Sequence, residues 1–320
     1  MKDITVKIWP EITGYIPAVL SYPNVDNKSN RIFLDFSNCT HVDSSGLNIL
    51  LIQLIKLTNA GGMQREWYAD YFSSTQFLET LHNLNFFKIL NYYSPNNSLF
   101  QSLFESKEPK AEQIVFKDQV KSYPIHLINY KEFANRRDAL GPFKEWLYLE
   151  LEAYYDRYDF ILPQFISIVT EIAKNSADHT LENAFFGLDV RESKDNDTIT
   201  IYFSIGDLGV GINQNIKNHL SDELRKRYEY WDLTQTYRVA LSRGFTTKGD
   251  SKENKGLGMS LILDGSNGMA LSLSVFDANS RGIMSNIESL VHSSLRKNFF
   301  NTGREVGFYY YGKLNAKKIA

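Results

Sequence analysis

Residues 198–205 constrain the fold of this chain more than any other stretch, because their apolar side chains fall on alternate positions. That period of two is typical of a β-strand with one buried face. Helical patterns precede this strand at about 131–158 and 163–179, and strand patterns follow it at 271–276 and 306–314. Helices followed by strands indicate a layer of helices packed on one sheet.

A polar and charged stretch at residues 105–121 separates this second half from a first half with a different pattern of apolar residues. The first half has the mixture of patterns typical of a small α/β unit. Its strand and helix patterns lie at 4–9, 31–36, 46–59 and 74–90. A chain of 320 residues is long enough for two domains of ordinary size. We therefore predict an α/β protein with a small mixed domain at 1–105, a connection at 106–130 and a second domain at 131–320.

The charge and the cysteine content exclude several classes of protein. Lysine and arginine total 35 and aspartate and glutamate total 37, so the net charge of −2 provides no overall field to attract a nucleic acid. Cys39 is the only cysteine, which excludes an intrachain disulfide and fits a reducing cytosol. The most apolar stretch, residues 47–57, is far shorter than the roughly 20 residues of a membrane span. We expect a cytoplasmic protein with neither a membrane segment nor a nucleic-acid partner.

Several familiar catalytic and phosphate-binding motifs do not occur. Gly209 and Gly211 follow a strand, as in a dinucleotide-binding loop, but Gln214 stands where that loop has its third glycine. No G-x-x-x-x-G-K-[ST], H-E-x-x-H or G-x-S-x-G string is found in the sequence. The sequence therefore gives little support to hydrolase and metalloprotease functions of these types.

Three acidic and amide side chains share one face of the helix predicted at 163–179. Glu171, Asn175 and Asp178 are spaced by four and three residues, which places them on one stripe, while apolar residues form a neighbouring stripe. Oxygen ligands of this kind suit a site for Mg²⁺ and phosphate, and a carboxylate there can orient or deprotonate water. A solvated helix face is the alternative explanation.

A second motif follows the strand at 198–205. Asp207 stands at the end of the strand, and Gly209 and Gly211 allow a sharp turn and close approach of the backbone to a ligand ring. The carboxylate is suited to accept a hydrogen bond from the exocyclic amine of adenine. An ordinary turn would explain the same pattern.

A third motif combines hydroxyls, a positive charge and glycines. Thr246, Thr247 and Lys248 suit a phosphate group, and Gly256-Leu257-Gly258 precedes a short helical pattern. Backbone N–H groups at a helix start attract an anion, and the helix dipole adds to this attraction. A surface loop without a ligand remains the alternative.

Taken together, the order and setting of these motifs resemble the ATP-binding boxes of the GHKL superfamily, which includes gyrase, heat-shock chaperones, histidine kinases and MutL. The resemblance covers about residues 162–314 and implies a two-layer α/β sandwich that binds ATP and Mg²⁺ under a lid at about 212–255. It implies that Asn175 holds Mg²⁺, Glu171 activates water and Asp207 recognises adenine. The residues implied to surround the base and phosphates are Gly209, Gly211, Thr247, Lys248, Gly256 and Gly258.

The first half contains a strand at 31–36, a loop, the string Asp43-Ser44-Ser45-Gly46 and then a helix. Asp and Ser before a helix are ordinary N-cap residues, each contributing about 1 kcal/mol. The same succession resembles a STAS domain, the fold of bacterial anti-sigma-factor antagonists, over about residues 4–93. That resemblance implies that Ser44 is a phosphoacceptor for a GHKL kinase.

These features favour a bacterial regulatory protein that binds ATP and controls a protein partner through ATP-dependent switching or serine phosphotransfer. Glu171 permits hydrolysis and transfer equally, so enzymatic activity stays open at this point. One alternative is an ATP-hydrolysing clamp that dimerises, as in topoisomerase-like and chaperone relatives. Another is an interaction module without catalytic activity.

Overall fold

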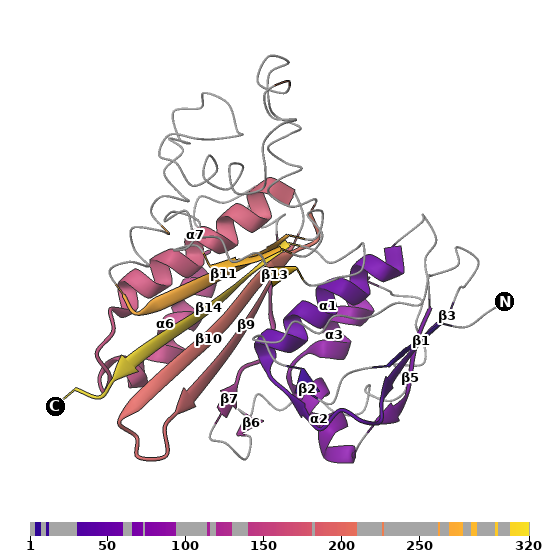
Figure 1. Cartoon of the computed structure of the whole chain (residues 1–320), viewed down its shortest axis with the longest axis horizontal. Coiled ribbons are helices and arrows are strands. Elements are labelled where there is room, and N and C mark those ends of the chain that lie inside the picture. Colours follow the sequence, from indigo (N-terminus) through magenta and orange to yellow (C-terminus); the bar gives the residue numbers. More distant parts are fainter. Residues whose placement is uncertain are drawn as a thin grey trace.

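The computed structural model describes parts of both halves of the chain. The residues it describes are 4–7, 11–12, 31–59, 66–72, 74–93, 114–115, 120–129, 140–180, 183–209, 226, 262, 269–277, 283–286, 298–299 and 308–319. Within them the protein is a mixed α/β structure dominated by one large antiparallel sheet (Figure 1). No helix in these ranges is both long enough and apolar enough to cross a membrane.

Nine strands of the described residues form this large sheet, in the order β13-β12-β11-β14-β10-β9-β7-β6, with β8 also paired to β9. All of their pairings are antiparallel. The bounds are β6 Ile114–Val115, β7 Val120–Ser122, β8 His126–Ile128, β9 Ala184–Glu192, β10 Thr198–Asp207, β11 Leu271–Asp277, β12 Ile283–Asn286, β13 Asn298–Phe299 and β14 Phe308–Lys317. The strand predicted at 198–205 is thus the first eight residues of β10.

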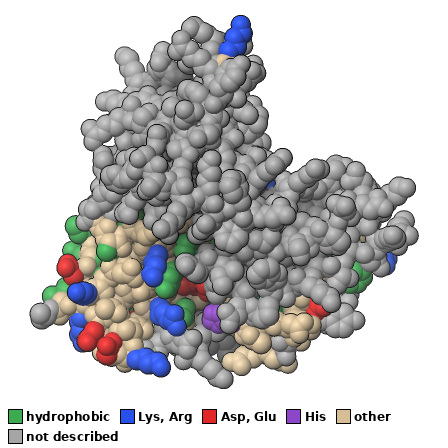
Figure 2. Space-filling model, in the orientation of Figure 1, with side chains coloured by type: hydrophobic (Ala, Val, Ile, Leu, Met, Phe, Trp, Pro, Cys, Tyr) green, Lys and Arg blue, Asp and Glu red, His purple; other side chains and the backbone are tan. Residues whose placement is uncertain are grey.

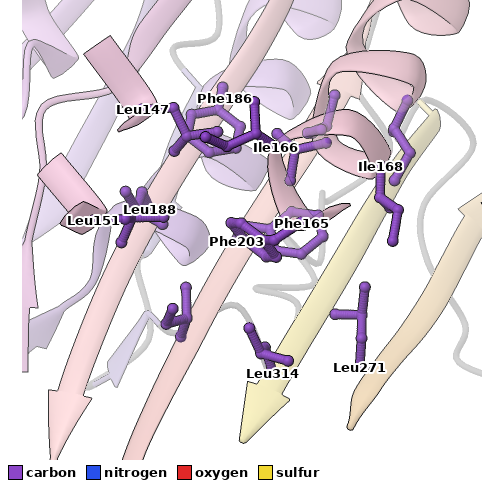
Figure 3. Close-up of a cluster of buried hydrophobic side chains, with 14 of the residues drawn as sticks. Leu147, Leu151, Phe165, Ile166, Ile168, Phe186, Leu188, Phe203, Leu271 and Leu314 are labelled. Carbon is purple, nitrogen blue, oxygen red and sulfur yellow. The ribbon is translucent and has the colours of Figure 1, made fainter. Parts of the chain in front are cut away.

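Two helices, α6 (Gly141–Tyr155) and α7 (Leu162–Thr180), cover one face of this sheet. Their apolar stripes pack on the inward residues of the central strands, and Figure 3 shows the side chains that meet there. Phe165 of α7 packs edge-on against Phe203 of β10, with ring centroids 5.5 Å apart. Gly312 of β14 is required beside this pair, because a Cβ at that position would overlap the Phe203 ring. The predicted helix layer on one sheet is therefore present.

The N-terminal module, defined here as β1 to β5 with α1 to α3, is a smaller unit. Its strands β1, β3 and β5 pair in parallel, as do β2 and β4. A buried apolar cluster around Phe36 and Leu51 joins these strands to the helices. The bounds are β1 Ile4–Lys7, β2 Glu11–Ile12, β3 Arg31–Phe36, β4 His41–Val42, β5 Glu66–Phe72, α1 Ser44–Asn59, α2 Thr75–Asn83 and α3 Phe86–Tyr93.

Helix α1 lies against the face of the large sheet that is turned away from α6 and α7, in contact with β9 and β10 (Figure 1). Ile49 packs on Tyr309 and Tyr311 of β14, and Phe185 of β9 belongs to the apolar cluster of the N-terminal module. The sheet is therefore covered on both faces. The sequence predicted a two-layer sandwich for the second half, and the additional layer is supplied by the first half.

Residues 120–128, which the sequence assigned to a connection, contribute strands β7 and β8 to the large sheet. This segment also contacts the N-terminal module, because Ile125 belongs to its apolar cluster and its N–H donates to the Leu84 carbonyl at 3.1 Å. The segment therefore packs with both units instead of only linking them.

Charged side chains on the described surface are mixed in sign. Figure 2 shows Lys, Arg, Asp and Glu side chains interspersed with apolar and uncharged polar ones near the end of the sheet opposite the grey region. This distribution on the visible described surface agrees with the net charge of −2.

Candidate functional site

The acidic and amide residues predicted on one helix lie on α7. Ile168, Val169 and Ile172 are buried under this helix, whereas Glu171 and Asn175 are half-buried beside them. The two polar side chains therefore stand at the margin of the helix–sheet interface. Asp178 lies in the same helix, but its side chain is outside the part of the chain that the structure describes.

Asp207 ends β10 and is only 2% exposed. Side chains alternate along a strand, so Asp207 projects to the same face as Phe203 and Ile205, the face covered by α7. Its Oδ1 accepts the Gly209 N–H at 2.8 Å, which closes a tight turn directly after the strand. The predicted strand-end carboxylate and turn are both present.

Helix α7 and strand β10 run toward the same end of the sheet. The chain before α7 lies near the β9–β10 hairpin, where the Tyr158 hydroxyl donates to the Asn196 carbonyl at 3.3 Å. The chain after α7 enters β9 at Ala184, which is paired with Asp207. The two elements therefore share one direction.

This common direction places the predicted site residues at about the same level of the sheet. Starting from the Phe165–Phe203 contact, ten helical residues to Asn175 advance by about 15 Å. Four strand residues from Phe203 to Asp207 advance by about 13 Å. The acid and amide of α7 and the carboxylate of β10 therefore lie at one end of one helix–sheet interface.

The remaining predicted site residues lie outside the described part of the chain, so their positions stay predictions. They are Gly211, Thr246, Thr247, Lys248, Gly256, Leu257 and Gly258. Among the described residues, no three His, Cys, Asp or Glu side chains are grouped as metal ligands. Amide and carboxylate oxygens such as those of Asn175 and Glu171 nevertheless match the hard ligands that Mg²⁺ takes alongside phosphate oxygens.

The turn after β10 has a second contact that the sequence did not indicate. The ammonium group of Lys56, in the last turns of α1, donates to the Gly209 carbonyl oxygen at 2.6 Å. Lys56 reaches the turn from the N-terminal module, 153 residues earlier in the chain. The loop that carries Asp207 is thus bonded to the helix that covers the opposite face.

A buried polar cluster holds the other end of α1 on β9. Asp189 is 1% exposed, and its carboxylate accepts the N–H groups of Ser44 and Ser45 at 2.8 and 2.9 Å. The hydroxyls of Ser45 and Ser122 donate to the same carboxylate. Burial raises the pKa of Asp189, and these hydrogen bonds oppose that rise. Asp189 therefore supplies acceptors for N–H groups that the start of a helix leaves without partners.

The structure buries Ser44, the serine that the STAS resemblance implies is a phosphoacceptor. Ser44 is fully buried, and its Oγ accepts the Leu188 N–H at 3.3 Å. A Cβ at Gly187 would lie 2.6 Å from the Ser44 carbonyl oxygen, so β9 approaches the start of α1 as closely as only glycine allows. Ser44 also lies on the face of the sheet opposite Asp207. Phosphate transfer to it requires that α1 first leave the sheet.

The expected N-cap role in the same segment is present. The Asp43 carboxylate accepts the Gly46 N–H at 2.6 Å, three residues on, which is the geometry of a helix N-cap. Asp43 and Asp189 together satisfy three backbone N–H groups in the first turn of α1.

Comparison of the chain with family models, with curated proteins and with solved structures found no match in any of the three. The resemblances to the GHKL and STAS families therefore rest on the motifs of the sequence. The geometry adds that Asn175 of α7 and Asp207 of β10 lie at about the same level along one face of the sheet.

Proposed function

We propose that the second half of the chain is an ATP-binding module of the GHKL type, and that the chain is a regulator whose nucleotide state controls a protein partner. The N-terminal module is proposed to be of the STAS type. The observation that carries the proposal is the buried carboxylate of Asp207, placed at the level of Asn175 and at the end of its strand. A buried acid at this edge is suited to bind the amino group of a purine.

The residues of α7 suit the phosphate end of the same ligand. Asn175 and the phosphate oxygens would hold Mg²⁺, which supplies charge neutralisation when it is bound. Glu171, half-buried at the margin of the interface, would take a proton from an attacking water or hydroxyl. The attacking oxygen would form a bond to the γ-phosphorus while the bond to ADP breaks.

The location of Ser44 favours switching over transfer to this serine within the docked chain. Its hydroxyl is buried between α1 and β9, and the proposed nucleotide site lies on the other face of the sheet. A phosphoryl group bound beside α7 therefore has no direct path to Ser44 in this arrangement.

Calorimetry of the full chain with Mg-ATP and Mg-GTP tests the proposal. We expect Mg-ATP to bind more tightly than Mg-GTP. The Asp207 carboxylate would accept a hydrogen bond from the exocyclic amine of adenine, whereas guanine has a carbonyl oxygen at that position, which the carboxylate would repel. Replacing Asp207 by asparagine keeps the side-chain size but removes the charge, and losing a charged hydrogen bond weakens Mg-ATP binding by about 10- to 150-fold.

The matched control is Asp197→Asn, an exposed aspartate in the β9–β10 hairpin, which should bind Mg-ATP like the parent. Phosphate release measured on the same samples separates hydrolysis from binding alone. An absence of Mg-ATP binding at millimolar concentration by the parent protein would refute the proposal and favour an interaction module without nucleotide.

A further inference from the structure

The turn after β10 forms hydrogen bonds with side chains from both faces of the sheet. On the face covered by α7, Asp207 accepts the Gly209 N–H at 2.8 Å. From the opposite face, Lys56 of α1 donates to the Gly209 carbonyl oxygen at 2.6 Å. One peptide segment is therefore fixed by the residue proposed to recognise the purine and by a helix of the N-terminal module.

Helix α1 is attached to the sheet along its length. At its start Asp189 accepts the N–H groups of Ser44 and Ser45. One turn later, the Asn48 amide donates to the Phe185 carbonyl oxygen at 3.1 Å and to the Ser204 hydroxyl at 2.9 Å. Ser45, Ile49 and Lys56 lie on one stripe of the helix by their spacing. Lys56 therefore reaches the turn only while this stripe stays on the sheet.

The interface under α1 differs from the interface on the other face. Between α6, α7 and the sheet most buried side chains belong to one apolar cluster, with Thr170 and Asp207 among the buried polar residues on that face. Under α1 they include Asp189, Asn48 and Ser204, and the buried Asn48 Oδ1 has no hydrogen-bond partner among the described contacts. Both amide atoms of Gln53, a buried residue of α1, are in the same situation. Buried polar groups without partners disfavour the docked state, so Asn48 and Gln53 lower the free-energy cost of releasing α1 from the sheet.

We propose that docking of α1 on the sheet and nucleotide binding at the Asp207 turn are coupled, with the docked helix favouring the bound nucleotide. The docked α1 holds the Gly209 carbonyl through Lys56 and so keeps the turn in the conformation that presents Asp207. Coupling of this kind is reciprocal, so nucleotide also strengthens the docking of the N-terminal module. This inference rests on the proposed nucleotide site, and it identifies the N-terminal module as the regulatory partner of that site.

Hydrogen exchange and calorimetry on the full chain test the coupling. The reporters are the backbone amides of Ser44 and Ser45, which are buried and bonded to Asp189 only while α1 is docked. We expect Mg-ATP to slow their exchange in the parent protein. In Lys56→Met we expect Mg-ATP to bind about threefold to tenfold more weakly and to lose its effect on these amides.

The matched control is Lys88→Met, which removes an exposed lysine from helix α3 of the same module and should leave both measurements unchanged. A second variant acts at the far end of α1. Gly187→Ala places a Cβ against the Ser44 carbonyl and should loosen docking without touching the turn. We expect it to speed exchange at Ser44 and Ser45 and to weaken Mg-ATP binding by a factor similar to that of Lys56→Met.

Failure of this inference is distinguishable from failure of the proposed function. If Mg-ATP binds the parent but leaves exchange at Ser44 and Ser45 unchanged, the coupling is refuted and the nucleotide site stands. Faster exchange in Gly187→Ala with unaltered Mg-ATP affinity would refute it as well. If the parent binds no Mg-ATP while these amides remain protected, the proposed function fails and the coupling fails with it.

Discussion

Replacing Asp189 by alanine is the most direct test of how the N-terminal module is held. In the native protein this carboxylate accepts the N–H groups of Ser44 and Ser45 and the hydroxyls of Ser45 and Ser122. Alanine removes all of these acceptors at once. The hydroxyls can rotate toward other partners, but the two N–H groups at the start of α1 point to a position that no other described group fills.

The expected loss of stability follows from the two backbone N–H groups that would have no acceptor. Each buried donor left without an acceptor costs about 1–3 kcal/mol. Part of this is offset, because burial raises the pKa of Asp189 and keeping its carboxylate ionised at neutral pH therefore opposes folding. We expect Asp189→Ala to lower the free energy of unfolding by about 2–4 kcal/mol.

Equilibrium urea unfolding at neutral pH measures this loss. The control is Asp197→Ala, at an exposed hairpin position, which should stay within about 0.5 kcal/mol of the parent. Ser45→Ala should lower the free energy of unfolding less in the Asp189→Ala variant than in the parent, because the Ser45 hydroxyl has already lost its partner there. If Asp189→Ala unfolds like Asp197→Ala, the carboxylate does not hold α1 and the reasoning is wrong.

Two further predictions concern the other face of the sheet. Gly312→Ala should lower the free energy of unfolding by about 1–3 kcal/mol, because its Cβ would overlap the Phe203 ring, and an unchanged urea midpoint would contradict this. Burial lowers the pKa of His126, whose ring stacks on Trp146 at 5.2 Å, so the folded protein favours the neutral ring. The unfolded chain then binds a proton more readily, and stability should decrease as the pH falls through the ordinary histidine value of 6.5, less so in His126→Phe.

The candidate site could be predicted as far as it depends on neighbours in sequence. The period of helix α7 placed Glu171 and Asn175 on one face, and the strand pattern at 198–205 placed Asp207 at the end of that strand; its burial was seen only in the structure. Lys56 could not be found in this way, because nothing near it in the chain indicates a contact with Gly209.

One signal of the second interface was present in the sequence. Residues 49–52 and 54–55 of α1 are all apolar, so the helix is hydrophobic on most of its circumference, as in a helix buried on several sides. The pattern indicates burial but does not identify the covering surface. Residues 120–128 were assigned to a connection because they adjoin the polar and charged stretch at 105–121. Strands β7 and β8 have only three residues each, too few for a period to be recognised.

The sequence by itself determined much of the local structure of this protein: where most helices and several strands run, although β9 (Ala184–Glu192) was not among the predicted strands. Period and turn chemistry depend on residues a few positions apart, so they are readable without a fold. Only the tertiary structure decided that Ser44 is buried and that Asp189 is its partner, because these residues are 145 positions apart. An aspartate on an alternating strand looks solvated until another element covers its face, and here that element is a helix from the other half of the chain.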